Sequence, residues 1–233
     1  MNGTPVRTDW KSPNHGDRKG RDVSMAVIHY TGMKSAKEAL ERLCDPEAQV
    51  SAHYVIEENG RTHQLVAEDR RAWHAGAGIW KGEADINSVS IGFELVNPGH
   101  EFGYREFPGE QIDALIDILE AVKARYNIPR ARIIGHSDLA PDRKEDPGEK
   151  FPWRALAAEK LAFGPWTGER PEQLPTEEEA AAMLSKIGYG VEMFGVEPCV
   201  TAFQRRFAPR LLGQKLFDDT RSAIWEVHKR VTA

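Results

Sequence analysis

Cysteine is scarce in this chain. Only Cys44 and Cys199 occur among 233 residues, and they are far apart in the sequence. Small secreted folds that depend on disulfides carry many more cysteines, so this class of protein is excluded. Both thiols are expected to be ordinary buried side chains in different domains.

Long apolar runs are also missing. No segment approaches the roughly 18 consecutive apolar residues of a transmembrane helix, and residues 1–25 contain no apolar stretch behind a basic start. The sequence therefore predicts neither a membrane span nor a signal peptide. This favours a cytoplasmic location, with the periplasm as the alternative if a signal peptide has been removed.

The chain lacks an excess of basic residues. Lys and Arg number 31 against 36 Asp and Glu, which gives a formal net charge of −5. No stripe of Lys or Arg alternates with aromatic residues, so a nucleic-acid partner is disfavoured.

With 40% hydrophobic and 29% charged residues, the chain can bury one good core and a smaller one. Two domains are expected.

Two common hydrolase motifs do not occur. The sequence has no Gly-x-Ser-x-Gly turn that would present a serine nucleophile. The segment His100-Glu-Phe-Gly-Tyr104 begins like the His-Glu-x-x-His motif of zinc proteases, but Tyr104 stands where the second histidine is required. A thermolysin-like site is therefore excluded.

Three other residues form a candidate metal site. His29 lies near the end of the β-branched apolar run 25–30, which predicts a buried strand. His136 and Asp146 flank a polar loop, with Lys144 between them. Two histidines and one carboxylate leave a fourth tetrahedral position open, which is typical of catalytic rather than structural zinc. The chain is therefore predicted to be a zinc hydrolase.

The periodicity up to residue 163 predicts an α/β fold with a mixed central sheet flanked by helices. Asn59-Gly60 favours a two-residue hairpin turn between two of the strands. A capping box at Ser35 opens a helix through Leu43, and a second helix is expected over 109–126 with Ile116 on its apolar stripe. The expected strands are 25–30, 53–58, 61–67, 89–96 and 131–135.

Glycine and proline cluster at 164–175, which indicates a linker. Three short amphipathic helices are expected after it, and they predict a small all-α three-helix bundle. The predicted organisation is an N-terminal arm at 1–20, a zinc-binding catalytic domain at 21–163, the linker at 164–175 and the bundle at 176–233.

Six segments together resemble the zinc-dependent N-acetylmuramoyl-L-alanine amidases of the AmpD/AmiD type, which share a fold with phage T7 lysozyme and the peptidoglycan recognition proteins. Their order along the chain is also that of the family. In the bundle, 184–189 and 202–207 resemble the peptidoglycan-binding domain often fused to cell-wall hydrolases. The six segments are 27–32 (VIHYTG), 51–54 (SAHY), 71–76 (RAWHAG), 90–95 (SIGFEL), 135–138 (GHSD) and 143–148 (RKEDPG).

The resemblance implies a reaction and roles for residues. The bond cut would join N-acetylmuramic acid, expected in its 1,6-anhydro form, to L-alanine in muropeptides that the cell recycles. One Zn²⁺ per chain would be held by His29, His136 and Asp146. Glu94 would be the general acid/base, and Lys144 would stabilise the oxyanion. Trp73, His74, Asn97 and His53 are candidate substrate contacts.

Three of these residues also have simpler structural interpretations. A lone His29 could be a packed core histidine, Asp146 before Pro147 could only form a turn, and Glu94 could be a strand-edge charge. Three other functions also remain. They are a non-catalytic peptidoglycan-binding protein on the same fold, a metallopeptidase that cuts within the stem peptide, and a periplasmic amidase that acts on polymeric peptidoglycan.

Overall fold

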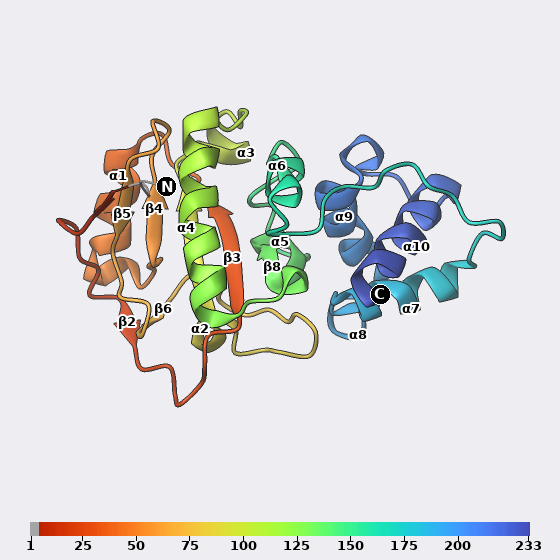
Figure 1. The fold of residues 1–233 in the computed structure, drawn as a ribbon, viewed down its shortest axis with the longest axis horizontal. Helices are drawn as coiled ribbons and strands as arrows, with labels where there is room; N and C mark the ends of the chain where they lie inside the picture. Colours follow the sequence, from red (N-terminus) through yellow and green to blue (C-terminus); the bar gives the residue numbers. More distant parts are fainter. Residues whose placement is uncertain (1–4) are drawn as a thin grey trace.

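The computed structural model describes residues 5–233, so residues 1–4 of the expected N-terminal arm lie outside the described part. A mixed six-stranded sheet forms one end of the molecule and a group of helices forms the other (Figure 1). The strands of this sheet are β1 (Val6–Arg7), β3 (Met25–Tyr30), β4 (Tyr54–Ile56), β5 (Thr62–Gln64), β7 (Ser90–Leu95) and β8 (Ile133–Gly135).

The sheet has the strand order β1-β5-β4-β7-β3-β8. Its central pairs β4·β7, β3·β7 and β3·β8 are parallel, and β4·β5 is antiparallel around the expected turn at Asn59 and Gly60. The predicted mixed α/β class is therefore confirmed. A separate small sheet pairs β2 (His15–Gly16) with β6 (Arg71–Ala72).

One face of the sheet packs against α4 (Gly109–Tyr126), which crosses it in Figure 1. Ile112, Leu115 and Leu119 of this helix are buried against alternate residues of β3 and β7, as the helical period predicts. Ile116 of the predicted stripe is only partly buried but packs against the same core, and Ile118, which was not predicted to be on the stripe, is buried.

Short helices connect and cover the remaining strands. Ser35 caps α1 (Ala36–Cys44) by accepting a hydrogen bond from the Glu38 amide at 3.2 Å, as expected. Cys44 is only half-buried, contrary to the expectation, whereas Cys199 is buried. The others are α2 (Ile86–Val89), α3 (Gly99–Phe102), α5 (His136–Leu139), α6 (Trp153–Ala158) and the 3₁₀ turns Pro46–Ala48, Arg130–Arg132 and Pro209–Leu211.

The C-terminal helices follow a segment at 164–175 that contains neither helix nor strand. Thr176 and Glu179 form the expected capping box at the start of α7 (Glu177–Ile187). Two longer helices follow, α9 (Val196–Phe207) and α10 (Asp218–Thr232), with the single turn α8 (Val191–Phe194) between α7 and α9.

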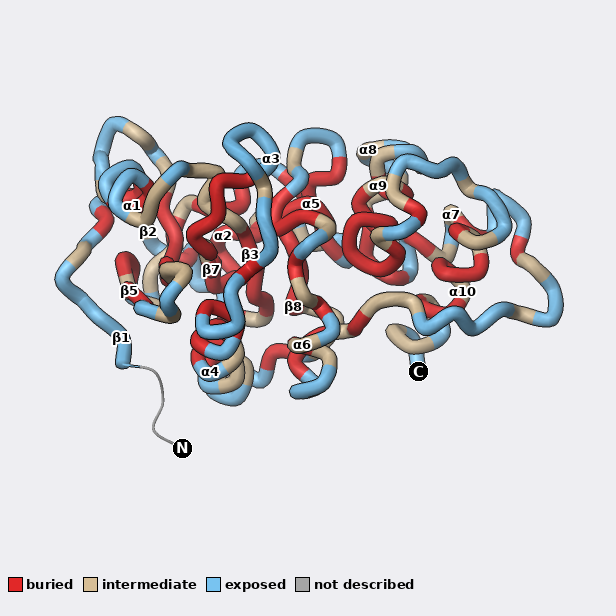
Figure 2. Tube along the Cα trace, turned by 90° about the horizontal axis from the view of Figure 1, so that it is seen from above, coloured by how far each residue is buried: buried red, intermediate tan, exposed pale blue. Residues whose placement is uncertain are grey.

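The core of the bundle is continuous with one face of the sheet. Met25 and Val27 of β3, Ile134 of β8 and Trp80 belong to the same buried cluster as Phe203 and the other apolar residues of the bundle. Figure 1 shows β8, α5 and α6 between the rest of the sheet and the bundle, and in Figure 2 the buried path continues from β3 through α5 to α9. The two predicted domains therefore share one apolar interface.

Among residues 5–233, no helix has both the length and the apolar character needed to cross a membrane.

Candidate active site

The sheet register brings two of the predicted site residues together. β3 and β7 are parallel, and His29 is the partner of Glu94 in their pairing. Side chains alternate between the two faces of a strand. Val27 therefore lies on the same face as His29, whereas Ile28 lies on the face that packs against α4. Partners in adjacent parallel strands share a face, which places the imidazole of His29 beside the carboxylate of Glu94.

The other two candidate ligands come from the neighbouring strand and the loop after it. Ile28 of β3 pairs with Gly135 of β8, so His136, the first residue of α5, follows directly beside His29. The backbone amide of Ser137 donates to the carbonyl of Asp146 at 2.8 Å. This bond holds the loop that carries Asp146 against the turn that carries His136.

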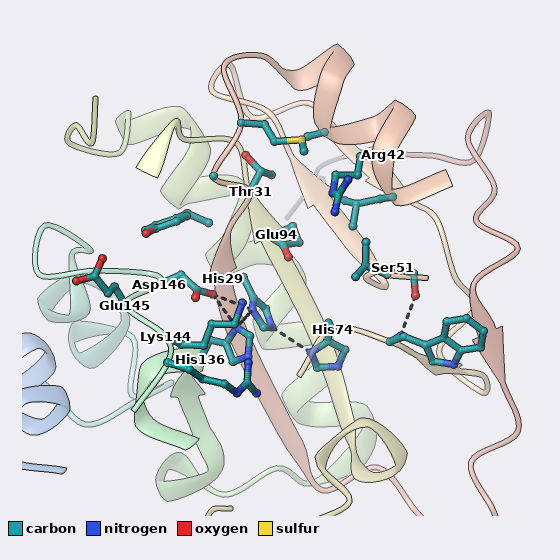
Figure 3. Close-up of a pocket in the computed structure, with 18 residues that line it drawn as sticks. His29, Thr31, Arg42, Ser51, His74, Glu94, His136, Lys144, Glu145 and Asp146 are labelled. Carbon is teal, nitrogen blue, oxygen red and sulfur yellow. Dashed lines mark hydrogen bonds and ion pairs between the residues drawn. The ribbon is translucent and has the colours of Figure 1, made fainter. Parts of the chain in front are cut away.

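Three ligand atoms converge at this point. His29 Nδ1 lies 2.9 Å from His136 Nδ1 and 2.9 Å from Asp146 Oδ2, and His136 Nδ1 lies 3.0 Å from the same Oδ2. All three residues are buried and together form a group able to hold a metal ion (Figure 3). Two imidazole nitrogens and a carboxylate oxygen are ligands that zinc prefers.

The outward-facing nitrogen of His136 fixes its tautomer. His136 Nε2 lies 2.9 Å from the carbonyl oxygen of Ala75, which can only accept a hydrogen bond. Nε2 therefore carries the hydrogen, and Nδ1 keeps its lone pair for a metal.

A longer chain of hydrogen bonds fixes the tautomer of His29. Ser90 donates its hydroxyl hydrogen to the Ile86 carbonyl at 2.6 Å, so its oxygen accepts from His74 Nε2 at 3.1 Å. His74 Nδ1 is then an acceptor, and His29 Nε2 donates to it at 3.0 Å. The lone pair of His29 Nδ1 consequently faces the other two ligands. Both histidines thus have the outer hydrogen-bond partners that metal-binding imidazoles usually have.

The absence of a side chain at Gly92 makes room for His74. A Cβ atom at Gly92 of β7 would lie 2.5 Å from His74 Cγ, which is closer than real contacts allow. The ring of His74 therefore packs directly on the backbone of β7, behind His29.

The charges around the three ligands suit a divalent cation. Burial lowers the pKa of His29 to about 4, with repulsion from His136 adding to it, so this imidazole is neutral at pH 7. Burial by itself would raise the pKa of Asp146, but the positive charge that His136 and His29 can carry when no metal is bound outweighs it and holds the pKa of this carboxyl well below its usual range. The neutral histidine and the ionised carboxylate are the forms that bind metal.

Glu94 and Lys144 lie beside the three ligands in a cavity of about 400 Å³ (Figure 3). Burial raises the pKa of Glu94 well above its ordinary value, and the negative charge of Asp146 adds to this effect while Lys144 opposes it. Glu94 Oε2 is buried and has no hydrogen-bond partner in the described part of the chain. An unpartnered buried carboxylate oxygen is costly, so its position here points to a group that receives protons or contacts a ligand.

The four candidate substrate contacts lie in different surroundings. Trp73 and His74 line the cavity, and His74 is also the partner of His29. His53 is buried outside the cavity lining, where its Nδ1 accepts from the Gly92 amide at 3.0 Å and its Nε2 donates to the Arg70 carbonyl at 3.0 Å. Asn97 is buried as well and donates to the Arg105 carbonyl at 2.9 Å.

Sequence reasoning missed several residues of the cavity. Arg42 on α1, Thr31 and Met33 after β3, and Ser51 line it. Arg42 lies on the polar side of an amphipathic helix, where an arginine has no distinctive pattern, so only the tertiary structure reveals its place.

A family model described as N-acetylmuramoyl-L-alanine amidase matches residues 19–149, which is more than half of the chain. The chain belongs to the N-acetylmuramoyl-L-alanine amidase family. The matched segment contains all three candidate ligands of this amidase as well as Glu94 and Lys144. The predicted family and the predicted class of enzyme are therefore confirmed.

Individual members of the family are similar over most of the chain. AmiD of Escherichia coli K12, an N-acetylmuramoyl-L-alanine amidase, is 35% identical over 213 residues, which cover 81% of this amidase and 76% of AmiD. The 1,6-anhydro-N-acetylmuramyl-L-alanine amidase AmpD of Haemophilus influenzae is 32% identical over 162 residues, which cover 61% of this amidase and 86% of AmpD.

A solved structure of E. coli AmiD with the substrate anhydro-N-acetylmuramic acid-L-Ala-D-gamma-Glu-L-Lys is also similar. The TM-score is 0.78 at 30% identity, and the match covers 96% of this amidase and 92% of that chain. The similarity to AmiD therefore includes the C-terminal helices as well as the sheet.

Proposed function

We propose that this protein hydrolyses the amide bond between N-acetylmuramic acid and L-alanine in muropeptides, including the 1,6-anhydro form, with one zinc ion held by His29, His136 and Asp146. The observation that carries the proposal is the convergence of three ligand atoms within 3.0 Å of one another beside Glu94 and Lys144. The substrate bound in the AmiD structure supports the anhydro sugar and the peptide that starts with L-alanine.

Zinc fits the donor set because the Nδ1 atoms of two imidazoles and one carboxylate oxygen face a common point. When bound, zinc would act as a Lewis acid that polarises the scissile carbonyl and makes water more acidic. The remaining chemistry belongs to the side chains around it.

Glu94 is assigned the proton transfer. An ionised carboxylate at this position can remove a proton from the attacking water and return it to the leaving nitrogen of L-alanine. Burial and the charge of Asp146 raise its pKa, so the carboxyl that has taken the proton of the water can keep it until the leaving nitrogen accepts it. The unpartnered Oε2 leaves one oxygen available for the water.

Lys144 is assigned the stabilisation of the oxyanion. Its positive charge lies close enough to Glu94 and His29 to affect the pKa of each. A cation in this cavity favours the negative charge that develops on the carbonyl oxygen. Removing one such contact typically costs about 3 kcal/mol of transition-state stabilisation.

The test is to incubate the zinc-loaded protein with soluble anhydro-N-acetylmuramyl tripeptide and to weigh the products. The expected products are the free sugar acid and a peptide whose N-terminus is L-alanine. A shortened peptide still joined to the sugar would identify a stem-peptide metallopeptidase. Saturable binding without any product would identify a peptidoglycan-binding protein.

A parallel incubation with intact sacculi addresses the polymeric substrate. We propose a preference for soluble muropeptides that carry the 1,6-anhydro sugar, which is the sugar in the name of AmpD. If peptide release from sacculi is equally fast, the protein is an amidase of polymeric peptidoglycan. In that case the helices at 176–233 are the candidate glycan-binding part.

A further inference from the structure

A buried carboxylate links the bundle to the metal-binding turn. Asp138 lies two residues after His136 in α5 and is 0% exposed. Its Oδ2 accepts from Arg206 Nη1 of α9 at 2.6 Å, and its Oδ1 accepts from the Tyr189 hydroxyl at 2.6 Å. Arg206 belongs to α9 and Tyr189 lies between α7 and α8, so two of its partners come from the C-terminal bundle. We refer to Asp138, Tyr189 and Arg206 as the Asp138 cluster.

Asp138 also holds the backbone that carries the ligands. Its Oδ2 accepts from the amide of Gly135 at 2.8 Å, immediately before His136. The amide of Ser137 in turn donates to the Asp146 carbonyl at 2.8 Å. The orientation of the Asp138 carboxylate therefore affects the turn that carries His136. Through Ser137 it also affects the loop that carries Asp146.

Arg206 is held firmly enough to fix that orientation. Its Nη2 donates to the carbonyl of Ile133 in β8 at 3.1 Å, and its guanidinium lies over the rings of Trp153 at 4.2 Å and Phe207 at 4.6 Å. The side chain is 3% exposed. A planar guanidinium fixed by stacking and by two acceptors gives its carboxylate partner a defined position.

We propose that Arg206 and Tyr189 are positioning residues for the metal site, so that the C-terminal helices take part in metal binding through Asp138. Removing one partner of a buried ion pair lowers stability whatever the role of the pair, whereas a positioning role also changes metal affinity, as the loss of outer contacts of metal ligands does. The proposal rests on the assignment of His29, His136 and Asp146 as zinc ligands.

The decisive measurement is the zinc dissociation constant, obtained by competition with a chelator. It is measured for folded proteins with Arg206→Met, Arg206→Lys or Tyr189→Phe. Arg206→Met is expected to weaken zinc binding by about 10-fold, the lower end of the effect of a group that contacts a ligand directly, and Arg206→Lys to recover part of this loss because the charge is kept. Tyr189→Phe removes a single hydroxyl and should fold normally with a smaller loss. Arg210→Ala, an exposed arginine of the same region, is the control and should bind zinc unchanged.

Amide hydrogen exchange in metal-free protein gives a second measurement that does not depend on zinc. The amides of Gly135 and Ser137 should exchange faster in Tyr189→Phe and Arg206→Lys than in the unmodified chain. If the melting temperature falls while zinc affinity and these two exchange rates stay unchanged, the Asp138 cluster has only a structural role and the proposal is wrong. If the unmodified chain binds no zinc, the proposed function fails, and the exchange rates still decide whether the cluster orders the turn.

Discussion

Glu94 is the residue on which the proposed chemistry depends most directly. Glu94→Gln keeps the shape of the side chain but cannot take a proton, and it does not remove a metal ligand. We therefore expect turnover of anhydromuropeptide to fall by ~10²–10⁴-fold with zinc content unchanged. Product release followed by chromatography, together with metal analysis, checks both parts. Near-normal turnover would mean that another group moves the proton.

The buried histidines make the stability of the metal-free protein depend on pH. Burial, with a further contribution from Arg18, lowers the pKa of His53 to about 3, against about 6.5 in an unfolded chain. Below pH 6.5 the unfolded chain therefore binds a proton that the folded chain does not. Stability should fall as the pH drops from about 6.5 towards 3, by about 1.4 kcal/mol per pH unit for this residue.

Urea unfolding at pH 7, 6 and 5 with a chelator present measures this dependence. His53→Asn should lose less stability between pH 6 and pH 5 than the unmodified protein does. Equal slopes for the unmodified protein and His53→Asn would show that His53 is not a buried neutral imidazole.

At the scale of single residues, the three candidate ligands could be predicted from their neighbours together with the resemblance to the family. His29 lies near the end of an apolar strand, and His136 and Asp146 flank a short polar loop. The support that His74 gives to His29 could not be predicted in this way. It depends on the space above Gly92, which only the packing of two distant segments reveals.

At the scale of elements, Gly92 of β7 is a position where the structure leaves no space for a side chain. Gly92→Ala would place a methyl group against the ring of His74 and displace it from His29. We expect zinc binding to weaken by ~10-fold or more, measured by chelator competition. Gly109→Ala at the start of α4 is the matched control, because its Cβ would meet no atom within 4 Å. Unchanged zinc affinity in Gly92→Ala would contradict the role given to His74.

Element prediction succeeded where periodicity extended over enough residues. Strands β3 and β7 and helix α4 lie where the apolar patterns place them. The two-residue strands β1, β2 and β6 are too short to carry an alternating pattern. Helix α5 is a single turn, and it forms because Asp138 accepts the hydrogen bond of Gly135 rather than because of any helical repeat.

For the whole molecule, the shared apolar interface changes the expected effect of truncation. The linker suggests from sequence that a chain ending near Trp166 could fold alone. In the structure such a chain would expose Trp80, Leu139 and Ile134, which the C-terminal helices cover. Each large apolar side chain returned to water costs about 1.5–3 kcal/mol. The interface itself could not be predicted, because an apolar helix face in the sequence does not indicate what it packs against.

A chain that ends at Trp166 is therefore expected to be insoluble or to melt at a much lower temperature than the full chain, and to lose activity on soluble and polymeric substrates alike. Thermal unfolding and both activity assays test this. Removal of the last residues only, after Arg230, is the control and should have a small effect. A truncated chain that melts normally and loses activity on sacculi alone would instead support a detachable glycan-binding domain.

The pairing of His29 with Glu94 across β3 and β7 also has a consequence for folding. His29 is 107 residues from His136 and 117 residues from Asp146, so the ligands meet only after strands from distant parts of the chain have associated. A slip of β3 by one residue would turn His29 to the opposite face of the sheet. Zinc binding measured during refolding would therefore report whether β3 has paired in the correct register, without any substrate.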